Sequence, residues 1–269
     1  MEVTAPEFVL GGAERLLRVS EAALSPDSAE LCEESGGWLA DPGVGVCRGA
    51  LGVILDDVTG YVVAAGSPPD RWPVSLGIRL DLLADPPVDG STLTATGRLV
   101  ARDDASGTTR GEVCGPDGNV LALITQRSHL LTVTEALTTP HIDATPPGPE
   151  TSLRAALAVR ELEPGVIELP PNPYAANGMG NIHGGILITG AEFAAMSALG
   201  ATGQLRTNSI DTAFVRPADA AHTITFRSRV QHRGRSMAVV EVAAVATSGK
   251  PCALATVIVR PQDSMEEIA

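Results

Sequence analysis

The stretch that decides the fold runs from position 177 to 200 and reads NGMGNIHGGILITGAEFAAMSALG. Its second part, positions 183–200, is apolar and rich in small residues, which predicts a buried helix. A similar stretch, RGALGVILDDVTGYVVAAG, occupies positions 48–66. The chain therefore holds two candidate core helices of the same character.

The spacing between these two stretches indicates an internal duplication. They begin 135 residues apart (183 − 48), and the acids Asp57 and Glu192 keep the same separation (192 − 57). Ser75 and Ser209, further along, lie 134 residues apart (209 − 75). A nearly constant offset between similar segments is the sequence signature of a repeated structural unit.

Each predicted helix is followed by segments with strand character, rich in Val, Leu, Ile and Thr. They cover positions 74–83, 91–102, 108–115 and 119–131 in the first half, and 208–217, 221–232, 235–247 and 251–261 in the second. One or two shorter strands are expected before each helix. Each half is thus predicted to be an α+β unit, with one helix on an antiparallel sheet. The units are expected to cover 1–131 and 153–269, joined by a Pro- and Thr-rich linker over 132–152.

Composition argues against several classes of partner. The chain has 19 basic and 32 acidic residues and a net charge of −13, which disfavours nucleic acid and anionic membranes. No apolar run is long enough to span a membrane, and the N-terminus lacks the pattern of a signal peptide. The four cysteines form no C-x-x-C pair, so we expect reduced thiols, no metal site and a cytoplasmic location.

The segment 177–185, NGMGNIHGG, matches the N-x-x-G-x-x-H-G-G signature of hotdog-fold acyl-CoA thioesterases of the PaaI type. Downstream, FVRP at 214–217 resembles the F-x-R-P segment of that family. With the duplication, the chain resembles a double hotdog, in which two fused units imitate the usual homodimer. The resemblance implies that each long central helix is wrapped by a curved antiparallel sheet, and that the two sheets join edge to edge.

The resemblance also implies a composite site that takes residues from both halves. Asp57 would be the general base or nucleophile, and Ser75 would position water or Asp57. The Gly184 N–H would polarise the thioester carbonyl, since it lies at the start of a helix where backbone amides lack partners. Asn177 would orient water or the carbonyl. His183 would help to hold the thioester, or would be a structural residue bonded to neighbouring backbone.

Other interpretations of these residues stay open. Gly184 could simply make a tight turn into the helix. Asp56 is expected to point away from Asp57, as a solvated or capping residue, because the two share no helix face. At the corresponding second site, which would be degenerate, the position of the motif Asn is occupied by Pro42 and no His is present. That site would contain Glu192, Arg48, Gly49 and Ser209, and an ion pair between Arg48 and Glu192 would be structural.

The leading functional hypothesis is therefore an acyl-CoA thioesterase that needs no metal or cofactor, with CoA as part of the substrate. Two alternatives are an enoyl-thioester hydratase or dehydratase of the same fold, and a non-catalytic acyl-CoA-binding module. Three arginines are candidates for the CoA phosphates: Arg216, Arg233 and Arg235. A homodimer of the fused chains is a further possibility, and the acyl chain is not identified.

Overall fold

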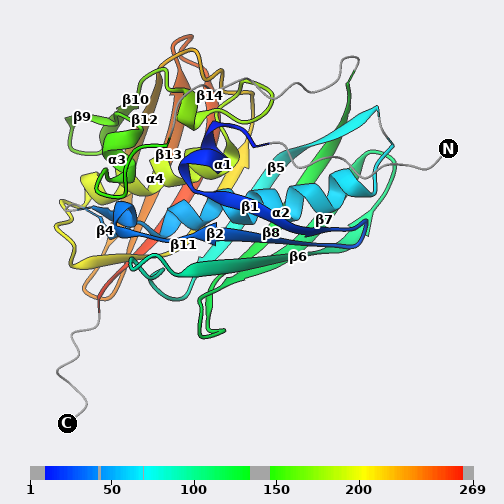
Figure 1. The fold of residues 1–269 in the computed structure, drawn as a ribbon. Coiled ribbons are helices and arrows are strands. Elements are labelled where there is room, and N and C mark those ends of the chain that lie inside the picture. The colour runs from blue at the N-terminus through cyan, green and yellow to red at the C-terminus, as the bar shows by residue number, and fades with distance from the viewer. Residues whose placement is uncertain (1–9, 42–43, 69, 134–145, 263–269) are drawn as a thin grey trace.

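The computed structural model describes residues 10–41, 44–68, 70–133 and 146–262. Within them, one 12-stranded antiparallel sheet holds two central helices against one face (Figure 1). The helices are α2 (Gly52–Ala65) and α4 (Gly184–Ala198), and each packs mainly on the strands of its own half.

The main helices and strands follow one another in the same order in the two halves. The first half contains α1 (Gly12–Leu16), β1 (Val19–Leu24), β2 (Ser28–Glu34), η1 (Gly37–Leu39), β3 (Ala40–Asp41), β4 (Gly45–Val46), η2 (Arg48–Leu51), α2, β5 (Arg71–Leu82), β6 (Thr92–Arg102), β7 (Ser106–Cys114) and β8 (Val120–Thr132). The second half contains α3 (Leu153–Ala156), β9 (Arg160–Glu163), β10 (Val166–Leu169), η3 (Pro173–Ala175), α4, β11 (Leu205–Phe214), β12 (Ile224–Arg233), β13 (Ala238–Ala246) and β14 (Pro251–Pro261).

The order of strands in the sheet confirms the duplication. It runs β1-β2-β6-β7-β8-β5 through the first half and continues β11-β14-β13-β12-β10-β9 through the second. The second half repeats the first in reverse spatial order, so that β5 and β11, the strands after each helix, meet at the centre. They pair antiparallel, with Gly77 opposite Ala213 and Asp81 opposite Ser209. This edge-to-edge join leaves neither central strand unpaired, and the predicted double hotdog is confirmed.

The two central helices begin differently. In α4 the helix starts at Gly184, and the Nδ1 atom of the preceding His183 accepts the Gly185 N–H at 3.0 Å as an N-cap. In the first half, the opening turn of the predicted helix over 48–66 is instead the 3₁₀ turn η2, and α2 follows from Gly52. The helices approach closely where Gly185 meets the backbone of Gly52 and Val53, and a methyl group at Gly185 would overlap that backbone.

Some expectations can be followed only in part. Most of the predicted linker, 134–145, and Pro42 lie outside the described residues. None of the described helices combines the length and the hydrophobicity that crossing a bilayer requires. All four cysteines are free thiols, with Cys47 and Cys252 buried.

Candidate active site

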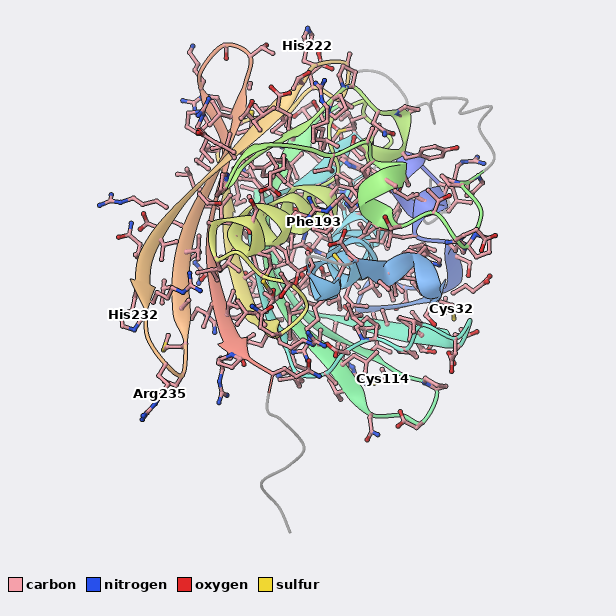
Figure 2. The ribbon with its side chains drawn as sticks, turned by 90° about the vertical axis from the view of Figure 1, so that its left-hand side faces the viewer. Cys32, Cys114, Phe193, His222, His232 and Arg235 are labelled. Carbon is pink, nitrogen blue, oxygen red and sulfur yellow. The ribbon has the colours of Figure 1, made fainter. Side chains whose placement is uncertain are left out.

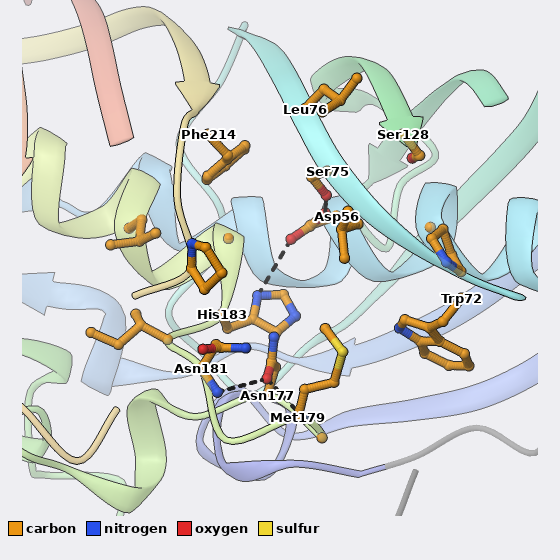
Figure 3. Close-up of a pocket in the computed structure, with 18 of the residues that line it drawn as sticks. Asp56, Trp72, Ser75, Leu76, Ser128, Asn177, Met179, Asn181, His183 and Phe214 are labelled. Atoms are coloured by element: carbon orange, nitrogen blue, oxygen red, sulfur yellow. Dashed lines mark hydrogen bonds and ion pairs between the residues drawn. The ribbon is translucent and has the colours of Figure 1, made fainter. Parts of the chain in front are cut away.

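A cavity of 480 Å³ lies between the two halves. Its walls come from α2, β5 and β8 of the first half, and from the 177–183 loop, the start of α4 and the 214–218 segment of the second (Figure 3). Many of the lining side chains are apolar or aromatic: Tyr61, Ala64, Trp72, Val74, Leu76, Leu131, Met179, Ile182, Leu187, Phe214, Val215 and Ala218. Such a volume is typical of a small-molecule site, and the polar groups concentrate at one end of it.

At the polar end, Asp56 is held by two side chains from neighbouring strands. Ser75 Oγ on β5 donates to Asp56 Oδ1 at 2.9 Å, and Gln126 Nε2 on β8 donates to the same oxygen at 2.6 Å. Gln126 Nε2 also lies 2.6 Å from Ser75 Oγ, which closes a triangle. Burial raises the pKa of Asp56, and the nearby Asp57 adds to this, whereas the hydrogen bonds from Ser75 and Gln126 act to lower it. The arrangement leaves Asp56 Oδ2 facing the cavity beside Gly184 and His183 (Figure 3).

Asp57 faces a different partner. Its Oδ1 lies 3.0 Å from His183 Nε2, and its Oδ2 is buried with no hydrogen-bond partner among the described residues. The expectation that Asp56 is solvated or caps the helix is wrong, because Asp56 is only 9% exposed. The reason is that every residue from Gly52 to Thr59 is buried, so this part of α2 has no solvent face. Both neighbouring acids therefore meet protein, and they face different nitrogens of His183: Asp56 Oδ2 lies 3.6 Å from Nδ1, and Asp57 Oδ1 lies 3.0 Å from Nε2.

Gly184 lies at the same end as Asp56. A methyl group added at Gly184 would overlap Asp56 Oδ2 and come within 3.3 Å of the Phe214 ring. Its N–H is at the first position of α4 and forms no hydrogen bond within the described parts of the chain. The absence of a side chain at Gly184 leaves room for the Asp56 carboxylate beside the start of α4, where backbone N–H groups carry partial positive charge.

Asn177 lines the cavity but its side-chain oxygen is already engaged. Asn177 Oδ1 accepts the backbone N–H groups of Met179 at 2.9 Å and Asn181 at 3.1 Å. These bonds order the loop before α4 (Figure 3). The structure thus brings all five residues of the expected first site to one cavity, with Asn177 shaping its wall.

The second expected site is closed. Glu192 is fully buried, and its Oε2 accepts the Gly49 N–H at 2.8 Å and lies 3.0 Å from Cys47 Sγ. Burial raises the pKa of Glu192, while its hydrogen bonds lower it. The interpretation of an Arg48–Glu192 ion pair is wrong: Arg48 Nε bonds Asp85 Oδ1 at 2.6 Å instead. Arg48 turns away because Glu192 already has backbone and thiol donors.

Two residues of the open site were not identified from the sequence. Gln126 lies in a predicted strand, where a polar side chain could as well face solvent, and only the β5–β8 pairing brings it to Asp56. Glu14 comes from the short helix α1, and its Oε1 lies 3.7 Å from His183 Nε2. Glu14, Asp57 and His183 each offer an atom within 4.8 Å of the others, a spacing that a metal ion or a shared proton could use.

No curated protein sequence matches the chain. Residues 179–253 match the model of the thioesterase superfamily. The match covers the end of the motif loop, α4 and most of the strands after it.

Solved structures match over nearly the whole chain. A TesB protein of Mycobacterium avium subspecies paratuberculosis has 10% identity and a TM-score of 0.65, covering 92% of this chain and 97% of its own. Acyl-CoA thioesterase II TesB2 of Mycobacterium marinum has 11% identity and a TM-score of 0.58, covering 94% and 98%. The 12:0-ACP thioesterase of Umbellularia californica has 12% identity and a TM-score of 0.61, covering 87% and 94%. At these identities, the structures establish a shared fold.

Proposed function

We propose that this protein hydrolyses acyl thioesters, with an acyl-CoA as the substrate and without a metal or cofactor. One observation carries the proposal: a buried carboxylate, Asp56, is fixed by Ser75 and Gln126 opposite the amide of Gly184, in a largely apolar cavity. A base, an oxyanion donor and an apolar binding cavity are the three parts that hydrolysis of an acyl thioester needs. The match of residues 179–253 to the thioesterase superfamily supports the same chemistry.

In the proposed reaction, Asp56 acts as general base. Asp56 Oδ2 takes a proton from a water molecule, whose oxygen attacks the thioester carbon. The Gly184 N–H stabilises the resulting oxyanion, aided by the dipole of α4. The C–S bond then breaks, and the proton held by Asp56 passes to the departing sulfur. The products are a carboxylic acid and a free thiol, so one water molecule is consumed for each thioester.

In this mechanism the role expected for Asp57 passes to Asp56. Asp57 is engaged with His183, and both ring nitrogens of His183 are occupied, by Asp57 and by the Gly185 N–H. His183 therefore serves to hold the start of α4, and Ser75 and Gln126 orient the base.

The cavity offers an apolar arm for the acyl group. It follows α2 from Asp56 past Gly60 to Ala64, which spans about 12 Å at 1.5 Å per residue. Tyr61 and Trp72 form an edge-to-face pair along it, with ring centroids 6.0 Å apart. Of the arginines considered for the CoA phosphates, Arg216 lines the cavity and is exposed. Arg235 lies at the tip of the β12–β13 hairpin (Figure 2), and neither it nor Arg233 lines the cavity.

The test is thiol release from a panel of acyl-CoAs and from the same acyl groups on acyl carrier protein. We expect turnover of acyl-CoA by the wild-type chain and its loss in Asp56→Asn. Turnover of the carrier-protein substrates alone would reject CoA as the carrier. Tight acyl-CoA binding without thiol release would favour the non-catalytic alternative.

A second candidate, hydration of an enoyl thioester, draws support from the His183–Asp57 pair at 3.0 Å. Such enzymes need an acid–base pair that can reach the substrate, whereas both nitrogens of His183 are engaged within the protein. Incubation with crotonyl-CoA separates the two functions. Loss of the enone absorbance without free thiol would support hydration.

A further inference from the structure

Glu14 is a buried acid beside the cavity that the proposed reaction does not use. It is 3% exposed, and its Oε2 has no hydrogen-bond partner among the described residues. The backbone of α1 is anchored on the second half, because the N–H groups of Gly12 and Ala13 both donate to Ala176 O. The carboxyl group of Glu14 is thereby held next to His183.

The hydrogen bonds of His183 define where its proton lies. Nδ1 accepts the Gly185 N–H at 3.0 Å, so this nitrogen uses its lone pair. Nε2 must then carry the proton, which it donates to Asp57 Oδ1 at 3.0 Å. Glu14 Oε1 lies further from Nε2, at 3.7 Å, beyond hydrogen-bond distance.

The charges around Glu14 favour its neutral form. Asp57 and Asp56 face it from α2, and His183 faces it from the start of α4. Glu33 of β2, also buried, adds negative charge near Asp57 when ionised. Asp57 has a donor to stabilise its charge, whereas no Arg or Lys among the described residues forms an ion pair with Glu14. Burial first, and the charge of Asp57 second, raise the pKa of Glu14 to about 8.

We propose that Glu14 is a positioning residue that holds a proton and thereby preserves the His183 cap on α4. The inference rests on the proposed function, since the cap fixes the Gly184 amide that would bind the thioester carbonyl. Burial lowers the pKa of His183, whereas the charge of Asp57 raises it, and the charge of an ionised Glu14 would raise it further and favour a doubly protonated ring. A proton on Nδ1 would remove the acceptor of the Gly185 N–H, and the start of α4 would shift.

The same reasoning argues for a proton over a metal ion in this cluster. A cation bound at Nε2 would require the ring proton to move to Nδ1, where the Gly185 N–H already donates. It would also require Glu14 to be ionised. Metal content of the purified protein is therefore part of the test.

The first experiment compares pH profiles of kcat and KM for wild type, Glu14→Gln and Glu14→Ala, with Glu163→Gln on exposed β9 as the control. The amide of Gln mimics a protonated carboxyl group. We expect Glu14→Gln to keep wild-type activity at pH 7, and Glu14→Ala to lose kcat by up to about a hundredfold through misplacement of the amide.

Wild type should lose activity as the pH rises through about 8, the pKa of Glu14, and Glu14→Gln should not. A common alkaline limb in wild type and Glu14→Gln, or equal damage in Gln and Ala variants that both fold, would overturn the proposal.

The second experiment needs no enzymatic activity, so it stands even if the proposed function fails. The ordinary pKa of a glutamate is 4.5, and burial raises that of Glu14 to about 8, so the folded chain is expected to hold an extra proton between these pH values. Relative to Glu14→Gln, the wild-type folding equilibrium constant should fall about tenfold for each pH unit by which the pH rises through that window. Parallel pH dependences in urea unfolding would contradict this. Stoichiometric divalent metal in wild type that is absent from Glu14→Gln would overturn it as well.

Discussion

The two composite sites of the chain have the same origin and opposite outcomes. In the open site, the Gly184 amide lies at a cavity, and Asp56 from the other half lies beside it. In the closed site, the equivalent Gly49 amide already donates to Glu192 at 2.8 Å. An acid that directly occupies the amide leaves no place for a carbonyl oxygen. The closed site therefore serves stability, as an internal bond between halves.

The sequence differences between the sites explain this outcome. At the offset of 135, Asp57 corresponds to Glu192 and Asp56 corresponds to Ala191. The strand register gives the next difference: Ile78 of β5 pairs with Gln126, and Ile210 of β11 pairs with Val257. The closed site thus lacks both the proposed base and the amide that orients it. The bulges that follow Ser75 in β5 and Thr207 in β11 place Thr207, and not Ser209, in the position of Ser75.

Arginine side chains complete the closure. Arg48 Nε and Arg206 Nε bond the two oxygens of Asp85 at 2.6 and 3.0 Å. Arg48 also donates to the carbonyl oxygens of Leu82 and Thr207. Where the open site has a histidine cap, the closed site has a charged network that ties η2 to β5 and β11. Duplication has kept the architecture in both halves and left one complete set of polar groups.

The largest effect is expected from a substitution that removes the proposed base of the open site. Asp56→Asn should reduce kcat by about 10²- to 10⁴-fold, since that is the usual contribution of a general base. Glu192→Gln, the acid-to-amide change in the closed site, should leave kcat unchanged. Thiol release under saturating acyl-CoA measures both. Equal losses in the two variants would mean that both sites turn over substrate.

The pH dependence of the open site follows from the same base. Burial raises the pKa of Asp56, and the carboxylate must be ionised to accept a proton from water. Activity should therefore fall as the pH drops through that raised value, with a slope of one decade per pH unit. A profile of kcat/KM from pH 4 to 7 checks this. A loss of activity at the ordinary pKa of an exposed aspartate would contradict the claim that burial raises the pKa of Asp56.

A smaller effect is expected from the side chain that has no counterpart in the closed site. Gln126→Leu removes a bond of 2.6 Å to Asp56 Oδ1, worth about 1.5–3 kcal/mol for a charged acceptor, or roughly ten- to a hundredfold in rate. Because Gln126 lowers the pKa of Asp56, its loss should also move the acid limb to higher pH. Kinetics over the same pH range measure both changes, and an unshifted acid limb would contradict the role of Gln126.

A serine on the strand that follows each central helix offers a further comparison. Ser75→Ala removes one bond to Asp56 Oδ1 and should lower kcat by about tenfold. Ser209→Ala, on the equivalent strand, should have no effect on kcat. Steady-state kinetics of the two variants side by side decide it, and a larger loss in Ser209→Ala would reverse the comparison.

A substitution in the closed site should change the stability of the fold and leave the activity unchanged. Glu192→Ala leaves the buried Gly49 N–H without its hydrogen-bond acceptor and should reduce the free energy of unfolding by about 1–3 kcal/mol. Its kcat should match wild type at temperatures where it remains folded. Urea unfolding gives the first quantity, and unchanged stability would argue that Glu192 has another role.

Much of this comparison could be predicted from the sequence, because a constant offset exposes the duplication and alternating apolar residues expose the strands. The choice between Asp56 and Asp57 could not. Helical spacing separates an inner from an outer face only where one face meets solvent, and α2 is buried all round at these positions. Gln126 and Glu14 were missed for a related reason, since strand pairing and the docking of α1 bring them to the site from distant positions.

The central claim is that a single open site, built from both halves, does the chemistry. A crystal structure with an acyl-CoA analogue that cannot be hydrolysed tests it most directly. The account predicts one analogue per chain, with its carbonyl oxygen on the Gly184 N–H and its carbonyl carbon facing Asp56 Oδ2. An analogue bound at Gly49, or two analogues in each chain, would contradict it.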